Sequence, residues 1–214
     1  MRDLRGLYSA LLGSFNEDGS VSEKGLRQII RHNIDHNKMD GLYVGGSTGE
    51  NFMLSTDEKK RIFEIAKDEA KDDITLMAQV GSVNLKESIE LAKFVEDLGY
   101  DAISAVTPFY YKFDFDEVHH YYERILEGVD MRMVIYFIPF LTGVNFSIEQ
   151  FKTLFENKKI VGVKFTQGDF YLLERMRKTF PDKLIFAGFD EMLLPATVLG
   201  IDGAIGSTYN VNAA

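Results

Sequence analysis

The chain has 214 residues, a length that fits one domain with a single large core. Hydrophobic residues make up 45% of the sequence and charged residues 27%, which is ordinary for a globular protein and excludes a disordered or fibrous chain. Acidic residues outnumber lysine and arginine by 33 to 24, and this net charge of −9 argues against nucleic acid as a partner. Disulfides and thiolate chemistry are excluded because the sequence has no cysteine.

No apolar run of the kind found in secretory signals follows residues 1–6. A stretch of about 18 apolar residues, which a membrane-spanning helix needs, is also absent. We therefore expect a cytoplasmic protein that has no membrane partner.

Short apolar runs alternate with longer segments of helical periodicity along the chain, a pattern typical of strand–helix units that build a parallel sheet. Several runs are continuously apolar, as expected for strands that are covered on both faces. Eight strands are predicted, at residues 7–12, 42–44, 76–80, 102–106, 133–137, 161–165, 184–187 and 203–205.

Signals for helix starts and stops lie between the predicted strands. The spacing of a capping box occurs strictly at Ser20, Ser55 and Ser147, each followed three residues later by Glu or Gln, and loosely at Asn84. Glycines at 99 and 200 are stop signals. Seven helices are thus predicted between the eight strands.

This alternation predicts an α/β fold, a (β/α)₈ TIM barrel, as a single domain over residues 1–214. Such barrels typically need about 250 residues, and only residues 207–214 follow the predicted eighth strand. We therefore expect a barrel truncated after strand eight, with the eighth helix missing. An open doubly wound sheet is the alternative, but no glycine-rich dinucleotide fingerprint follows the first strand.

Active sites of such barrels are built from the loops after the carboxyl ends of the strands. After the second predicted strand, residues 45–50 read Gly-Gly-Ser-Thr-Gly-Glu, so that Ser47, Thr48 and several backbone N–H groups surround one point. Such a loop suits a carboxylate or a phosphate. A plain glycine-rich turn is the alternative interpretation.

Lys164 stands inside an otherwise apolar predicted strand. Its side chain either extends to the barrel mouth as a structural charge, or is desolvated so that a neutral amine can attack a carbonyl. Tyr136 lies near the end of the preceding strand. It is either a core aromatic or, beside Lys164, a phenol that relays the proton which Schiff-base chemistry requires.

Other polar side chains follow strands four, seven and eight, namely Tyr110, Tyr111, Asp190, Glu191 and Ser207. Asp190 could cap the next helix, bind hydroxyls of a sugar, or do both.

The histidines do not predict a metal site. His32 and His36 have a spacing that could hold a metal, but no third ligand is near in sequence. His119 and His120 are adjacent on a predicted helix and face different directions. A solvated helix surface is the better interpretation of both pairs.

Six motifs, in order along essentially the whole chain, resemble a known family. They are residues 45–50, Ser-Ala-Val-Thr-Pro-Phe-Tyr-Tyr at 104–111, Ile-Tyr-Phe-Ile-Pro at 135–139, Gly-Val-Lys-Phe-Thr at 162–166, Gly-Phe-Asp-Glu at 188–191 and Gly-Ser-Thr-Tyr-Asn-Val-Asn at 206–212. The sequence resembles the dihydrodipicolinate synthase / N-acetylneuraminate lyase family of class I aldolases. Members of that family continue with an eighth helix and a C-terminal helical extension.

The resemblance implies roles for individual residues. Lys164 would form a Schiff base with the keto carbon of the substrate, and Tyr136 would transfer a proton. Ser47 and Thr48 would hold the substrate carboxylate. Tyr110 would reach the site of a neighbouring subunit and support its reactive tyrosine, which implies a homo-oligomer, a tetramer in the family. The sugar chain would contact Thr166, Gly188, Asp190, Glu191 and Ser207.

The resemblance also implies small-molecule substrates (sialic acid, pyruvate and N-acetylmannosamine) and no cofactor or metal. Dihydrodipicolinate synthases usually carry an arginine just after the tyrosine strand, and residues 139–145 contain none, which favours the lyase branch. Three alternatives stay open. The chain could act on another sugar acid, act as a synthase of the dihydrodipicolinate type, or be a split-barrel fragment that needs a complementary C-terminal chain.

Overall fold

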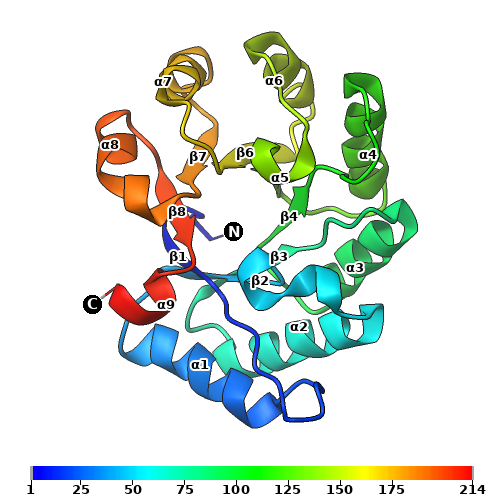
Figure 1. Cartoon of the computed structure of the whole chain (residues 1–214), viewed down its shortest axis with the longest axis vertical. Helices are drawn as coiled ribbons and strands as arrows, with labels where there is room; N and C mark the ends of the chain where they lie inside the picture. The colour runs from blue at the N-terminus through cyan, green and yellow to red at the C-terminus, as the bar shows by residue number, and fades with distance from the viewer. Residues whose placement is uncertain (1, 214) are drawn as a thin grey trace.

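Eight parallel strands close into a ring in the computed structural model, which describes residues 2–213 (Figure 1). Each strand pairs with the next, and β8 pairs with β1. The strands are β1 (Gly6–Ala10), β2 (Gly41–Val44), β3 (Thr75–Gln79), β4 (Ala102–Val106), β5 (Met133–Phe137), β6 (Ile160–Phe165), β7 (Leu184–Ala187) and β8 (Gly203–Gly206). The predicted (β/α)₈ barrel is confirmed, while Met1 and Ala214, the ends of the predicted domain, lie outside the described residues.

Helices cover the outside of the ring, except for the short α5, which lies nearer its centre (Figure 1). They are α1 (Glu23–Asp35), α2 (Thr56–Ala70), α3 (Leu85–Asp97), α4 (Phe115–Glu127), α5 (Pro139–Thr142), α6 (Ile148–Leu154), α7 (Phe170–Thr179), α8 (Leu193–Val198) and α9 (Tyr209–Asn212), with 3₁₀ turns η1 (Ser47–Gly49), η2 (Asn51–Met53) and η3 (Asp190–Met192). Among residues 2–213, none of the helices combines the length and apolarity needed to cross a bilayer.

Two cores result from the alternation of side chains along each strand. On β5, Met133, Ile135 and Phe137 pack against the helices, whereas Val134 and Tyr136 belong to a second cluster inside the barrel. Because successive side chains of a strand point to opposite faces, this alternation decides which residues line the barrel interior.

Local hydrogen bonds fix most of the predicted helix starts. Ser55 and Ser147 form capping boxes as predicted, and Asn84 caps α3 through the N–H of the second helical residue. The capping box predicted at Ser20 is wrong. Its hydroxyl instead donates to Asp18 at 2.6 Å in a turn before α1, because these two side chains lie two residues apart.

The chain forms one helical turn, α9, after the eighth strand, where no helix was predicted. A buried asparagine, Asn210, holds this turn in place. Asn210 donates from Nδ2 to the backbone carbonyls of Ala10 at 2.7 Å and Ser207 at 2.9 Å. Its Oδ1 accepts from Asn33 of α1 at 3.2 Å. These bonds fix the turn against β1 and α1.

We expect Asn210→Ala to lower the free energy of unfolding by about 1 to 3 kcal/mol, because the buried Ala10 carbonyl and Asn33 amide each lose a partner. Urea unfolding followed by circular dichroism measures this. Asn212→Ala, at an exposed position of the same turn, is the matched control and should change stability by less than about 0.5 kcal/mol. Equal stability of the two variants would contradict a stabilising role of Asn210.

Candidate active site

Lys164 points into the barrel near the carboxyl end of β6. Its neighbours Val163 and Phe165 belong to the outer core, so alternation turns Lys164 inward, where the residue is only 4% exposed. The strand register sets it beside Tyr136 of β5 and Phe186 of β7. The predicted pair of Lys164 and Tyr136 is therefore brought together by adjacent strands.

Two aromatic rings enclose the amine of Lys164. Its Nζ lies 4.0 Å from the ring centroid of Tyr136 and 4.2 Å from that of Tyr43 on β2. The two rings are 6.0 Å apart with an interplanar angle of 84°. The sequence alone does not indicate Tyr43, because it lies 121 positions from Lys164 and only the closure of the barrel brings the two together.

Burial lowers the pKa of Lys164 from its ordinary 10.5 to about 7, and the carboxylate of Asp190 opposes this shift. Because the cation is disfavoured by desolvation, a large fraction of the side chain is a neutral amine at neutral pH. Of the two interpretations made from the sequence, the structure favours the desolvated amine over a solvated structural charge.

The predicted hydroxyls of Ser47, Thr48 and Ser207 form two separate contacts at the ends of the strands. The Tyr136 hydroxyl is 3.4 Å from Ser47 Oγ, a long contact, and burial raises the pKa of this phenol while the contact with Ser47 lowers it. Thr48 Oγ1 and Ser207 Oγ are 2.7 Å apart and share a hydrogen bond. The turn η1 thus links β5 and the loop after β8 across the mouth.

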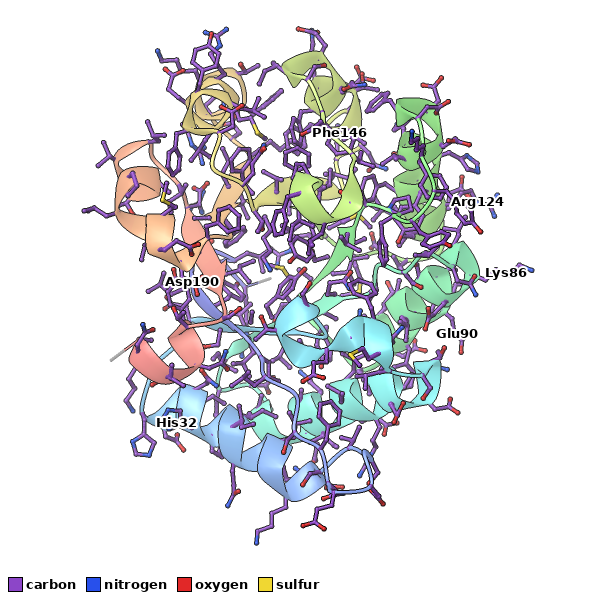
Figure 2. All side chains as sticks on the ribbon, viewed as in Figure 1. His32, Lys86, Glu90, Arg124, Phe146 and Asp190 are labelled. Carbon is purple, nitrogen blue, oxygen red and sulfur yellow. The ribbon has the colours of Figure 1, made fainter. Side chains whose placement is uncertain are left out.

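Asp190 does not act as the helix cap that its position allowed. Its Oδ2 accepts from the backbone N–H of Thr208 at 2.7 Å, and neither η3 nor α8 has a side-chain cap. This bond holds the loops after β7 and β8 together. Figure 2 shows Asp190 beside these loops, whereas His32 lies on the outer helix α1.

Thr166 and Gly188 continue the site at the ends of β6 and β7. The Thr166 hydroxyl is buried and has no hydrogen-bond partner among residues 2–213. A side chain at position 188 would collide with this hydroxyl, so only glycine fits beside it. Glu191, on η3, is exposed.

Tyr110 is not brought to Lys164 by its own chain. It is 85% exposed in the loop between β4 and α4, with φ +80°, and the centroid of its ring is 5.0 Å from that of Tyr111.

A cavity of about 350 Å³ lies beside Ser47 and Phe109, the residue before Tyr110. Its lining is mostly apolar and comprises Ser47, Glu50, Phe52, Met53, Val106, Phe109, Ile138, Leu141 and Thr142.

Within residues 2–213, no three His, Cys, Asp or Glu side chains gather as metal ligands. The rings of His32 and His36 are 5.3 Å apart on α1. This pair lies away from the strand ends that carry Lys164.

The chain is a (β/α)₈-barrel protein that buries a lysine amine near the carboxyl ends of its strands. A family model described as "Dihydrodipicolinate synthetase family" matches residues 3–214, and the chain belongs to this family. The N-acetylneuraminate lyase of Clostridium perfringens is 78% identical over 209 residues, which cover 98% of this chain and 73% of that protein.

Two solved structures are similar throughout. The structure of CdNal from Clostridium difficile in complex with mannosamine is 76% identical, with a TM-score of 0.98, over 99% of this chain and 73% of that one. The N-acetylneuraminate lyase from Fusobacterium nucleatum complexed with pyruvate is 70% identical, with a TM-score of 0.94, over 98% of this chain and 71% of that one.

The position of the buried amine predicts an unusual titration. With ¹³C-labelled lysine, we expect one Cε resonance to titrate with a midpoint of about pH 7, since desolvation disfavours the ammonium form. Lys164→Met should remove that resonance. If every lysine resonance titrates above about pH 9, the amine is not desolvated in solution.

Proposed function

We propose that the chain is an N-acetylneuraminate lyase, a class I aldolase that cleaves N-acetylneuraminate to N-acetylmannosamine and pyruvate and catalyses the reverse condensation. The observation that carries this is the buried, desolvated amine of Lys164 at the catalytic end of the barrel. The 78% identity to a protein named N-acetylneuraminate lyase supports the choice of substrate.

In this proposal, the neutral amine of Lys164 attacks the keto carbon of the open-chain sugar acid. A C–N bond forms, and the carbonyl oxygen leaves as water after protonation, so that a positively charged iminium results. The bond between the α and β carbons then breaks as the β-hydroxyl loses its proton, and the electron pair of that bond forms the C=C of an enamine by neutralising the iminium. N-acetylmannosamine departs as the aldehyde, and the remaining enamine is protonated and hydrolysed to pyruvate and free lysine.

We assign proton transfer to the hydroxyl of Tyr136. Bond cleavage leaves an aldehyde where the sugar acid carried a hydroxyl, so a base must accept that proton and later return one to the enamine. Tyr136 is paired with Lys164 in the register of β5 and β6, and its hydroxyl contacts Ser47 Oγ at 3.4 Å. That contact connects the phenol to the loop that would hold the carboxylate.

Ser47 and Thr48 would bind the substrate carboxylate, since their hydroxyls and the backbone N–H groups of the glycine-rich loop are all donors. The sugar chain would then extend over the loops after β6, β7 and β8. The residues proposed to contact it are Thr166, Gly188, Asp190, Glu191 and Ser207. The Thr166 hydroxyl, which has no hydrogen-bond partner within residues 2–213, would bind a sugar hydroxyl.

We also propose that the chain acts as a homo-oligomer, in which Tyr110 reaches the site of a neighbouring copy. Its exposed ring and its position near the cavity beside Ser47 support this assignment. The cytoplasmic location expected from the sequence stays a prediction.

The competing activity within the family is a synthase of the dihydrodipicolinate type. Residues 139–145, which form α5 and the segment after it, carry no arginine for a second carboxylate. We therefore favour lyase activity over synthase activity. Activity measured on a panel of sugar acids and dicarboxylate substrates distinguishes these two activities.

We expect the protein to release pyruvate from N-acetylneuraminate in an assay coupled to lactate dehydrogenase. Lys164→Met should lose this activity entirely, because the other buried lysine among residues 2–213, Lys59, lies on α2 in an ion pair with Glu87. Lys86→Met is the control, since Lys86 is exposed on α3 at the rim of the molecule (Figure 2). Activity that survives in Lys164→Met would contradict the mechanism, and wild-type activity on another substrate alone would contradict the assignment.

Tyr136→Phe should lower kcat by about 10²- to 10⁴-fold while Schiff-base formation with pyruvate is retained, because the ring stays and only the proton-transfer group is removed. Steady-state kinetics and borohydride trapping measure the two effects separately. Tyr171→Phe, at a position that is 77% exposed on α7, is the control. An unchanged kcat in Tyr136→Phe would remove Tyr136 from the mechanism.

A further inference from the structure

We propose that Tyr43 is a further catalytic residue, whose ring face binds and stabilises the positively charged nitrogen that forms at Lys164. This inference rests on the proposed Schiff-base function and adds a residue to it. Tyr43 lies on β2, and its side chain is fully buried inside the barrel.

The geometry is that of a cation held against an aromatic face. Lys164 Nζ lies 4.2 Å from the ring centroid of Tyr43, well within the roughly 6 Å over which a ring face attracts a cation. The face of a ring carries partial negative charge, and this attraction is stronger where water is excluded. Tyr136 presents its ring to the same nitrogen from a nearly perpendicular direction.

Two features fix the ring of Tyr43 in place. Its hydroxyl donates to Ser104 Oγ of β4 at 3.0 Å, across the barrel interior. In addition, a side chain at position 46 would come within 2.8 Å of the ring, so Gly46 leaves the space that the ring occupies. Because the hydroxyl is bonded to Ser104, Tyr43 offers Lys164 its face rather than a proton.

The ring and the burial act on different species of the reaction. Burial favours the neutral amine that attacks the keto carbon. Attack and loss of water then convert this amine into an iminium whose nitrogen carries a full positive charge in the same dry site. The ring face compensates for the missing water at that stage, and it lets a desolvated nitrogen become cationic.

The test changes the charge on the ring face while keeping its shape. Tyr43→Phe is compared with variants that carry 4-fluoro-, 3,5-difluoro- and 3,4,5-trifluorophenylalanine at position 43, since each fluorine withdraws electrons from the face. Borohydride trapping is measured against pyruvate concentration at about pH 8.5, where the free amine is neutral and the iminium is the only cation at this nitrogen.

We expect the half-saturating pyruvate concentration to rise stepwise with fluorination. Tyr43→Leu, which removes the face altogether, should raise it by about 2- to 30-fold relative to Tyr43→Phe. Ser104→Ala keeps the ring and is the control for the lost hydrogen bond. Thermal unfolding shows whether each variant is folded. If Tyr43→Leu does not fold, the comparison of Tyr43→Phe with the fluorinated variants still tests the role of the ring face.

Equal half-saturation across the fluorinated series would overturn the role of the ring face and leave Tyr43 as packing only. If the wild-type protein forms no adduct with pyruvate at any concentration, the proposed function itself fails, so the two failures are distinguishable.

Discussion

The amine of Lys164 is held away from water inside the barrel. A lysine inside a barrel loses most of its hydration, and its ammonium form becomes costly unless something replaces the water. Lys164 is 4% exposed, and the compensation it receives comes from two aromatic faces and from the more distant charge of Asp190. The protein thereby keeps the amine neutral for attack and still provides surroundings in which it can carry a charge.

The barrel supplies the rigidity that this balance needs. Parallel pairing sets Lys164 beside Tyr136, and ring closure brings β2 opposite β6 so that Tyr43 reaches the same nitrogen. Bonds between loops then hold the mouth, from Thr48 to Ser207 and from Asp190 to the loop after β8. The site is therefore fixed by strand register inside the barrel and by loop contacts above it.

Local patterns were sufficient to predict the strands and the barrel, and to single out Lys164 as a charge inside an apolar strand. They left open whether its side chain is desolvated or extends to the barrel mouth. They were not sufficient for Tyr43, whose contact with Lys164 depends on closure of the whole ring. The cap interpretation of Asp190 was wrong for a similar reason, since its partner lies in a loop 18 residues later. Tyr110 was placed correctly in a strand-end loop, but whether it completes a site depends on a second copy of the chain.

The position of covalent attachment identifies directly which amine forms the Schiff base. Reduction with borohydride in the presence of pyruvate, followed by proteolysis and mass spectrometry of the peptides, reports which lysine formed the Schiff base. A single reduced adduct on Lys164, despite the many exposed lysines, is the result that a desolvated and ring-stabilised amine predicts. An unmodified Lys164, or an adduct distributed over surface lysines, would contradict it.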